Sequence, residues 1–242
     1  MKASHGPSGP RDTRRLPTAA TARCTADRVF FEAHAQRLLE AARHAQPRRY
    51  ALGIAGIGGS GKSTLARYLH EACEQAEPGG AAVLAMDGFH LSNAELHRRG
   101  LSQFKGSPET FDTGSFLELL QRARAGEVGL PYPIYDRVAH EPAFPQDCRL
   151  SGGTRLLIVE GNYLLLDEPP WDRLATLLDE CWLIDVAPER AKRWIITRHQ
   201  RGGRSRADAE GHYERTDRPN AERVLANMQQ PRLVVRWPDD TP

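Results

Sequence analysis

One segment of the chain, from Gly56 to Ser63, restricts the possible fold more than any other. It reads Gly-Ile-Gly-Gly-Ser-Gly-Lys-Ser and matches the pattern G-x-x-x-x-G-K-[ST] at every position. An apolar run at 51–55 precedes it, and a helical pattern at 63–76 follows it. Strand, glycine-rich loop and helix in this order predict a phosphate-binding loop (P-loop) at the edge of a parallel sheet.

Each residue type in this segment has a physical reason. Glycines let backbone N–H groups turn inward onto phosphate oxygens, and the start of the next helix adds unpaired N–H groups. Lys62 is expected to reach the β- and γ-phosphates, and Ser63 to ligate Mg²⁺. ATP and Mg²⁺ are therefore the expected cofactors. The residues expected to bind the nucleotide are Gly56, Gly58, Gly59, Ser60, Gly61, Lys62, Ser63 and Thr64.

After this loop, short apolar runs alternate with helical patterns, which is typical of βαβ units. We expect an α/β P-loop NTPase fold with a five-stranded parallel sheet, helices on both faces and an Arg-rich lid. The expected strands are 50–55, 81–86, 155–159, 181–185 and 232–236, and the expected helices are 62–75, 114–125, 171–179, 189–200 and 218–229.

Composition sets the domain organisation and excludes several classes. The 242 residues suffice for one α/β domain, and a formal net charge of +2 gives no reason to expect a nucleic-acid partner. No apolar run reaches the roughly 20 residues of a membrane span, and the N-terminus lacks a secretory signal, so we expect a cytoplasmic protein. The four cysteines are far apart, without a C-x-x-C pair.

The expected parts are a disordered basic arm (1–25), an N-terminal helix (26–48) and a nucleotide-binding domain (49–238), with an acceptor-binding insertion (88–154) and a lid (193–216).

Two acidic residues follow predicted strands. Asp87 comes at the end of the second strand, where it would face the γ-phosphate, accept the proton of an attacking hydroxyl or help hold Mg²⁺. The alternative is that Asp87 caps a helix beginning near Leu91. Glu160 ends the third strand in the manner of a Walker B acid, and is expected to hold Mg²⁺ beside Ser63. His90 either bonds to a substrate or packs in its loop.

An arginine-dense segment follows the fourth strand. It holds Arg193, Arg198, Arg201, Arg204 and Arg206 around Gly202-Gly203. Guanidinium groups neutralise the charge that phosphoryl transfer develops, and a hinged helix pair can exclude water. We expect a lid in which Arg198, Arg201 or Arg204 acts in catalysis; the alternative is a solvated basic helix face.

Together these residues resemble the uridine kinase, phosphoribulokinase and pantothenate kinase superfamily of P-loop kinases, and within it the nucleoside/nucleotide kinase branch often labelled fructose-transport kinase-like. The resemblance runs from about Tyr50 to Trp237. It implies that Asp87 is the catalytic base. The segments that carry it are the P-loop, 86–90 (MDGFH), 105–112 (KGSPETFD), 133–137 (PIYDR), 160–166 (EGNYLLL) and 217–220 (DRPN). The acceptor contacts that it implies are His90, Lys105, Tyr135, Asp136, Arg137 and His140.

Two departures from the uridine kinases affect this expectation. Arg137 stands where uridine kinases usually carry an aromatic residue, which argues against a pyrimidine nucleoside as acceptor. The lid reads Arg201-Gly202-Gly203-Arg204 in place of a tight R-G-R, which leaves open which arginine touches the γ-phosphate.

The expected function is ATP-dependent transfer of a phosphoryl group to a hydroxyl of a metabolite, such as a sugar, a nucleoside or a pantothenate-like compound. Two alternatives stay open. One is a P-loop ATPase that drives or regulates a protein partner, and the other is a nucleotide-binding module without chemistry. ATP and the metabolite are the expected partners, without nucleic acid or membrane, and a homodimer is open.

Overall fold

The structure, a computed structural model, describes residues 22–238, so most of the expected disordered arm lies outside the described residues. A six-stranded, wholly parallel sheet forms the centre of the fold, with the order β1-β8-β7-β2-β6-β3. The predicted α/β parallel-sheet fold is confirmed, with six strands instead of five. The strands are β1 (Ala22–Thr25), β2 (Tyr50–Ala55), β3 (Ala81–Ala85), β6 (Leu156–Gly161), β7 (Glu180–Ile184) and β8 (Leu233–Arg236).

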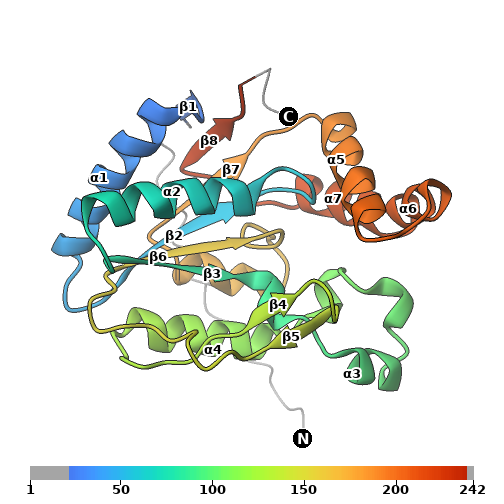
Figure 1. Ribbon diagram of the computed structural model, residues 1–242, viewed down its shortest axis with the longest axis horizontal. Coiled ribbons are helices and arrows are strands. Elements are labelled where there is room, and N and C mark those ends of the chain that lie inside the picture. Colours follow the sequence, from blue (N-terminus) through green and yellow to red (C-terminus); the bar gives the residue numbers. More distant parts are fainter. Residues whose placement is uncertain (1–21, 239–242) are drawn as a thin grey trace, which may run out of the picture.

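Helices cover both faces of this sheet (Figure 1). Alternate residues of β2 separate the two faces: Leu52 and Ile54 belong to the core under α1 (Arg28–His44) and α2 (Lys62–Ala76). Ala51 and Ala55 belong to the opposite core, which includes apolar residues of α4 (Thr113–Arg124) and of the 3₁₀ helix η4 (Trp171–Thr176). Burial on both sides explains why the central strands read as unbroken apolar runs.

Strand β1 corrects the expected arm at residues 22–25. It pairs in parallel with β8, from Ala22 opposite Leu233 to Thr25 opposite Arg236. Asp27 then caps α1, because its carboxylate accepts the N–H of Phe30 at 2.8 Å. The sixth strand therefore comes from a segment that has no apolar run of its own.

The segment between α4 and β6, expected to be irregular, contains an antiparallel hairpin of β4 (Ile134–Asp136) and β5 (Glu141–Ala143). The hairpin lies beside the carboxyl end of β3, near the short helix α3 (Asn93–Arg98) (Figure 1). The helix expected at 171–179 is a 3₁₀ helix that ends at Thr176. Shorter 3₁₀ segments are η1 (Met86–Phe89), η2 (Ser102–Phe104) and η3 (Pro108–Thr110).

Most of the segment between β7 and β8 is helical. Its helical elements are α5 (Pro188–Arg201), α6 (Arg206–His212), the π-helical turn η5 (Tyr213–Asp217) and α7 (Arg218–Ala226). α5 and α6 stand at the same end of the sheet as the P-loop (Figure 1). Among the described helices, none is long and apolar enough to cross a membrane.

Candidate active site

The predicted P-loop joins β2 to α2 at the carboxyl edge of the sheet. Gly59 (φ 73°) and Gly61 (φ 91°) have left-handed backbones, which glycine adopts without strain. A Cβ on Gly59 would lie 2.6 Å from the carbonyl oxygen of Ala191 in α5. The loop is also anchored from the other side, because the indole of Trp237 donates to the carbonyl of Ser60 at 2.9 Å. The packing of α5 and Trp237 therefore fixes the conformation of the loop, and this conformation requires glycine at positions 59 and 61.

Lys62 is a buried cation within this loop. Its side-chain ammonium donates to the carbonyl of Ile57 at 3.0 Å, and within residues 22–238 this is its one recorded hydrogen bond. Burial lowers the pKa of Lys62 to about 8, against the opposing charges of Glu160 and Asp87. An ammonium has three donors, so two remain for an anion.

Other groups of the loop also fit a phosphate. α2 begins at Lys62 without a side-chain cap, so the N–H groups of its first turn are open to an anion. The buried hydroxyl oxygen of Ser60 has no hydrogen-bond partner within the described residues. The donors and the charge thus suit the phosphates of a nucleotide.

Ser63 and Glu160 bring two oxygen ligands together. The Ser63 hydroxyl donates to the Glu160 carboxylate at 2.9 Å. Burial, followed by the charge of Asp87, raises the pKa of Glu160, while Lys62 and Ser63 oppose that rise. Oxygen ligands of this kind suit Mg²⁺, so the donor set fits the metal predicted here.

Asp87 lies in η1, just beyond β3, and its charge acts on both Lys62 and Glu160. Its carboxylate faces Arg137 of the hairpin turn, at 3.7 Å from Nη2. The capping alternative is wrong: Ser92 caps the next helix, α3, by accepting the N–H of Glu95. The Asp87 side chain remains about a third exposed and available for a substrate.

Three of the six predicted acceptor residues, His90, Tyr135 and Arg137, lie around Asp87, and a fourth, Lys105, lies beside Tyr135. The His90 ring lies between Phe111 and Tyr135, with ring centroids 4.0 and 4.7 Å away, and its Nδ1 lies 2.8 Å from the Asp87 carbonyl. Burial lowers the pKa of His90, and it also lowers the pKa of Lys105. The Lys105 ammonium lies 5.6 Å from the Tyr135 ring centroid. Arg137 completes this cationic, aromatic wall.

Of the other two, Asp136 is the last residue of β4 and His140 lies in the hairpin turn. The Asp136 carboxylate accepts the N–H groups of Val138 and Ala139 at 2.7 and 3.0 Å, which lowers its pKa. His140 has φ 53°, an exposed side chain and a carbonyl that accepts from Lys105 at 2.6 Å. Both residues shape the turn that presents Arg137.

The three lid arginines that we expected to act in catalysis differ in their surroundings. The charge of Arg198, on the last turn of α5, acts on Lys62. The charge of Arg204 acts on His212 instead, and Arg198, Arg201 and Arg204 are all exposed. Arg198 is therefore the lid arginine with a recorded interaction with the phosphate-binding lysine.

The lid also contains a cluster that the sequence analysis did not identify: His199, His212 and Asp217. His199 Nε2 lies 3.3 Å from Asp217 Oδ2, and His212 Nε2 lies 3.9 Å from the same oxygen. A Cβ built on Gly58 would lie 3.9 Å from the other carboxylate oxygen of Asp217, so the cluster borders the P-loop. Asp217 stands in the 217–220 segment noted above, but no spacing pattern links it to the two histidines.

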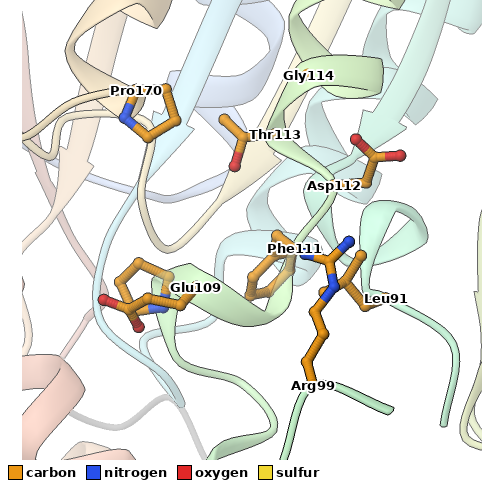
Figure 2. A pocket seen from close by; sticks show the side chains of 9 residues that line it. Leu91, Arg99, Glu109, Phe111, Asp112, Thr113, Gly114 and Pro170 are labelled. Carbon is orange, nitrogen blue, oxygen red and sulfur yellow. The ribbon is translucent and has the colours of Figure 1, made fainter. Parts of the chain in front are cut away.

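An open cavity of about 350 Å³ lies elsewhere, at the start of α4 (Figure 2). Phe111 lines it, and the His90 ring lies against Phe111. None of the predicted site residues lines this cavity, so the candidate site is the P-loop edge. Its lining residues are Leu91, Arg99, Pro108, Glu109, Phe111, Asp112, Thr113, Gly114 and Pro170.

Comparison with known proteins places the chain among kinases. No protein-family model matches it. The uncharacterised protein YggC of Escherichia coli is 38% identical over 80% of this chain and 80% of its own length. A candidate uridine kinase of Schizosaccharomyces pombe is 34% identical over 83% of this chain and 87% of its own. The solved structure of a candidate fructose transport system kinase from Silicibacter is 33% identical, with a TM-score of 0.77, covering 86% of this chain and 98% of that one.

The sequence similarity spans at least four fifths of this chain in each case, and the Silicibacter structure shares its fold. The chain therefore belongs to the uridine kinase, phosphoribulokinase and pantothenate kinase superfamily of P-loop kinases, in its fructose-transport kinase-like branch.

Proposed function

We propose that this small-molecule kinase transfers the γ-phosphoryl group of ATP to a hydroxyl of a metabolite, with Asp87 as the catalytic base. One observation carries the proposal: the Asp87 carboxylate acts electrostatically on Lys62 and Glu160 and at the same time meets Arg137 of the opposing hairpin. It thus stands between the phosphate-binding lysine and a wall of groups that can hold an acceptor.

Each group has a role that its position supports. The amides of the P-loop and the Lys62 ammonium hold the β- and γ-phosphates. Ser63 and Glu160 would hold Mg²⁺, which neutralises charge on the phosphate oxygens. Asp87 accepts the proton of the acceptor hydroxyl as its oxygen attacks phosphorus, and the bond from phosphorus to the leaving ADP oxygen breaks. Arg198 balances the charge on the migrating group.

The wall opposite Asp87 suits a polyhydroxylated or anionic acceptor. Lys105 and Arg137 bring two positive charges, and Tyr135 and His90 bring polar aromatic edges. The Arg137 side chain is 58% exposed and reaches Asp87 only at 3.7 Å, so a substrate can displace that contact at little cost. A carboxylate or phosphate on the acceptor would pair with a guanidinium fork better than a neutral base would.

The test is a screen of hydroxyl-bearing metabolites for acceptor-stimulated release of ADP, with Lys62→Ala and Asp87→Asn as controls. A proton acceptor of this kind is worth about 10²–10⁴-fold in rate, so Asp87→Asn should lose that much while ATP affinity changes little. Lys62→Ala should lose ATP binding as well.

Two results would contradict the proposal. ATP turnover that is appreciable without any acceptor and unchanged by all of them would indicate an ATPase. Tight ATP binding without turnover, equal in the wild type and Asp87→Asn, would indicate a nucleotide-binding module.

A further inference from the structure

The lid cluster of His199, His212 and Asp217 has no role in the proposed phosphoryl transfer. Each residue comes from a different element: α5, the end of α6 and the end of the π-helical turn η5. Their ligand atoms all lie within 4.8 Å of one another. The side chains are 17%, 21% and 18% exposed, so they are sheltered but remain reachable from solvent.

We propose that His199, His212 and Asp217 form a binding site for a divalent transition metal, with Zn²⁺ the best fit, that clips α5 to the end of α6 and the π-helical turn. This site does not depend on which acceptor the kinase uses.

The distances support three ligands of one tetrahedral ion. Zinc bonds of about 2.0 Å to nitrogen and oxygen place neighbouring ligands about 3.3 Å apart. The His199–Asp217 separation of 3.3 Å equals that value, and the His212–Asp217 separation of 3.9 Å is slightly longer. The two imidazole nitrogens lie up to 4.8 Å apart, so the rings would have to close on the ion, and a water molecule would supply the fourth ligand.

The ligand types select the class of metal. Two imidazoles and one carboxylate suit zinc and its neighbours, whereas Mg²⁺ prefers oxygen ligands throughout. The site is thus chemically distinct from the Ser63–Glu160 pair. The charges of Arg204 and Arg215 lie near His212 and oppose a cation, so we expect moderate affinity and a reversible clip.

The local backbone is a second indication of function. Residues 213–217 form a π-helical turn, a rare geometry that is frequently found at functional sites. This turn places Asp217 opposite both imidazoles, with its other carboxylate oxygen toward Gly58 of the P-loop. A metal here would fix the lid next to the phosphate-binding loop.

The test is calorimetric titration of the metal-stripped full-length protein with ZnCl₂ in excess Mg²⁺, repeated with Co²⁺ to observe its absorption bands. The wild type should bind one Zn²⁺. Loss of even an outer-shell partner weakens metal affinity about 10–100-fold, so His212→Gln and Asp217→Asn should weaken binding at least that much. His97→Gln, on exposed α3, is the matched control and should bind as the wild type does.

A measurement on the wild type alone covers the case in which the variants do not fold. Zn²⁺ should protect His199 and His212, but not His97, from modification by diethylpyrocarbonate. The proposal is overturned if the wild type shows no saturable zinc binding, if His212→Gln and Asp217→Asn bind with unchanged affinity, or if zinc leaves the modification of all three histidines unchanged.

Discussion

Lys62 shows how this site holds a charge ready for a ligand. A buried ammonium with a single recorded acceptor, the Ile57 carbonyl, is costly in the free protein. The shift of its pKa from 10.5 to about 8 corresponds to roughly 3 kcal/mol of unfavourable burial at neutral pH. Phosphate oxygens would fill the two remaining donors, so ligand binding and relief of this cost are coupled.

The pKa of Lys62 predicts two opposite pH dependences. Between about pH 8 and 10.5 the unfolded chain keeps a proton that the folded, ligand-free protein has lost, so the Lys62 contribution to the free energy of unfolding rises with pH in that window. ATP affinity, which needs the charged form, should fall as the pH rises above about 8.

Calorimetric ATP titrations across this window, together with urea unfolding of the free protein, check both trends. Lys62→Met should remove both dependences and stabilise the ligand-free protein near neutral pH, while weakening ATP binding. An ATP affinity that falls equally steeply with pH in Lys62→Met would show that another group is responsible.

Among the individual residues, those within one contiguous motif could be predicted from the sequence. Lys62 and Ser63 lie on one turn of a helix, and Glu160 is the acid at the end of an apolar strand, so local pattern and sheet edge suffice to place them. His199, His212 and Asp217 meet because α5 folds back on α6 and η5. That packing leaves no regular spacing in the chain.

At the scale of elements, α5 distinguishes among arginines that look equivalent in the sequence. Arg198→Ala should lower kcat by on the order of 10³ or more, since an arginine that balances charge on the migrating phosphoryl group contributes at least that much. Arg201 is exposed like Arg198 but is not among the charges that act on Lys62, so Arg201→Ala should stay near the wild type. Steady-state kinetics with the acceptor found in the screen would measure both effects. An equal loss of kcat in the two variants would mean that the total charge of the lid matters and that no single guanidinium does.

The β4–β5 hairpin is the element that brings Arg137 to Asp87, and it depends on a close backbone approach. A Cβ on Gly88 would lie 2.5 Å from the Pro133 carbonyl oxygen just before β4, so Gly88→Ala must push the hairpin away from η1. We expect a higher KM for the acceptor and a lower kcat, with ATP affinity retained.

Gly114→Ala is the matched control for this change. Its Cβ would meet nothing nearer than an Asp112 carboxylate oxygen at 3.6 Å, and alanine favours the helix α4. Kinetics in which Gly88→Ala and Gly114→Ala behave alike would remove the hairpin from the acceptor site.

The elements that the sequence predicts well are those whose own residues determine them. The 50–55 run matches β2, and the expected helices at 62–75 and 189–200 match α2 and α5 within one residue at each end. β1, β4 and β5 have three or four residues each, and none of them is a continuous apolar run. Pairing decides these strands, β1 with the distant β8 and β4 with β5 across a short turn, and the residue pattern does not reveal this pairing.

At the scale of the whole molecule, one buried arginine joins the sheet to the layer below it. Arg49, just before β2, is 2% exposed and donates to four carbonyl oxygens at 2.8–3.0 Å. Burial lowers its pKa, and no carboxylate pairs with it among the recorded contacts of the described chain. The four carbonyls belong to the end of α4, the turn after it and the approach to β6: Ala123, Glu127, Ser151 and Thr154.

This arrangement predicts a large stability effect at Arg49 without an effect on the active site. Arg49→Met leaves four buried carbonyls without their donors, so the free energy of unfolding should fall by roughly 3 kcal/mol. Arg48→Met is the matched control. Arg48 is exposed and pairs with Asp179, and Asp179 still pairs with Arg124 at 3.0 Å when Arg48 is removed. The free energy of unfolding should therefore fall by less than about 1 kcal/mol in Arg48→Met. Urea unfolding gives both values, and ATP titration below the transition should show wild-type affinity in both variants. Equal stabilities would mean that the carbonyls find water or other donors, and that the two layers are held together by their apolar contacts alone.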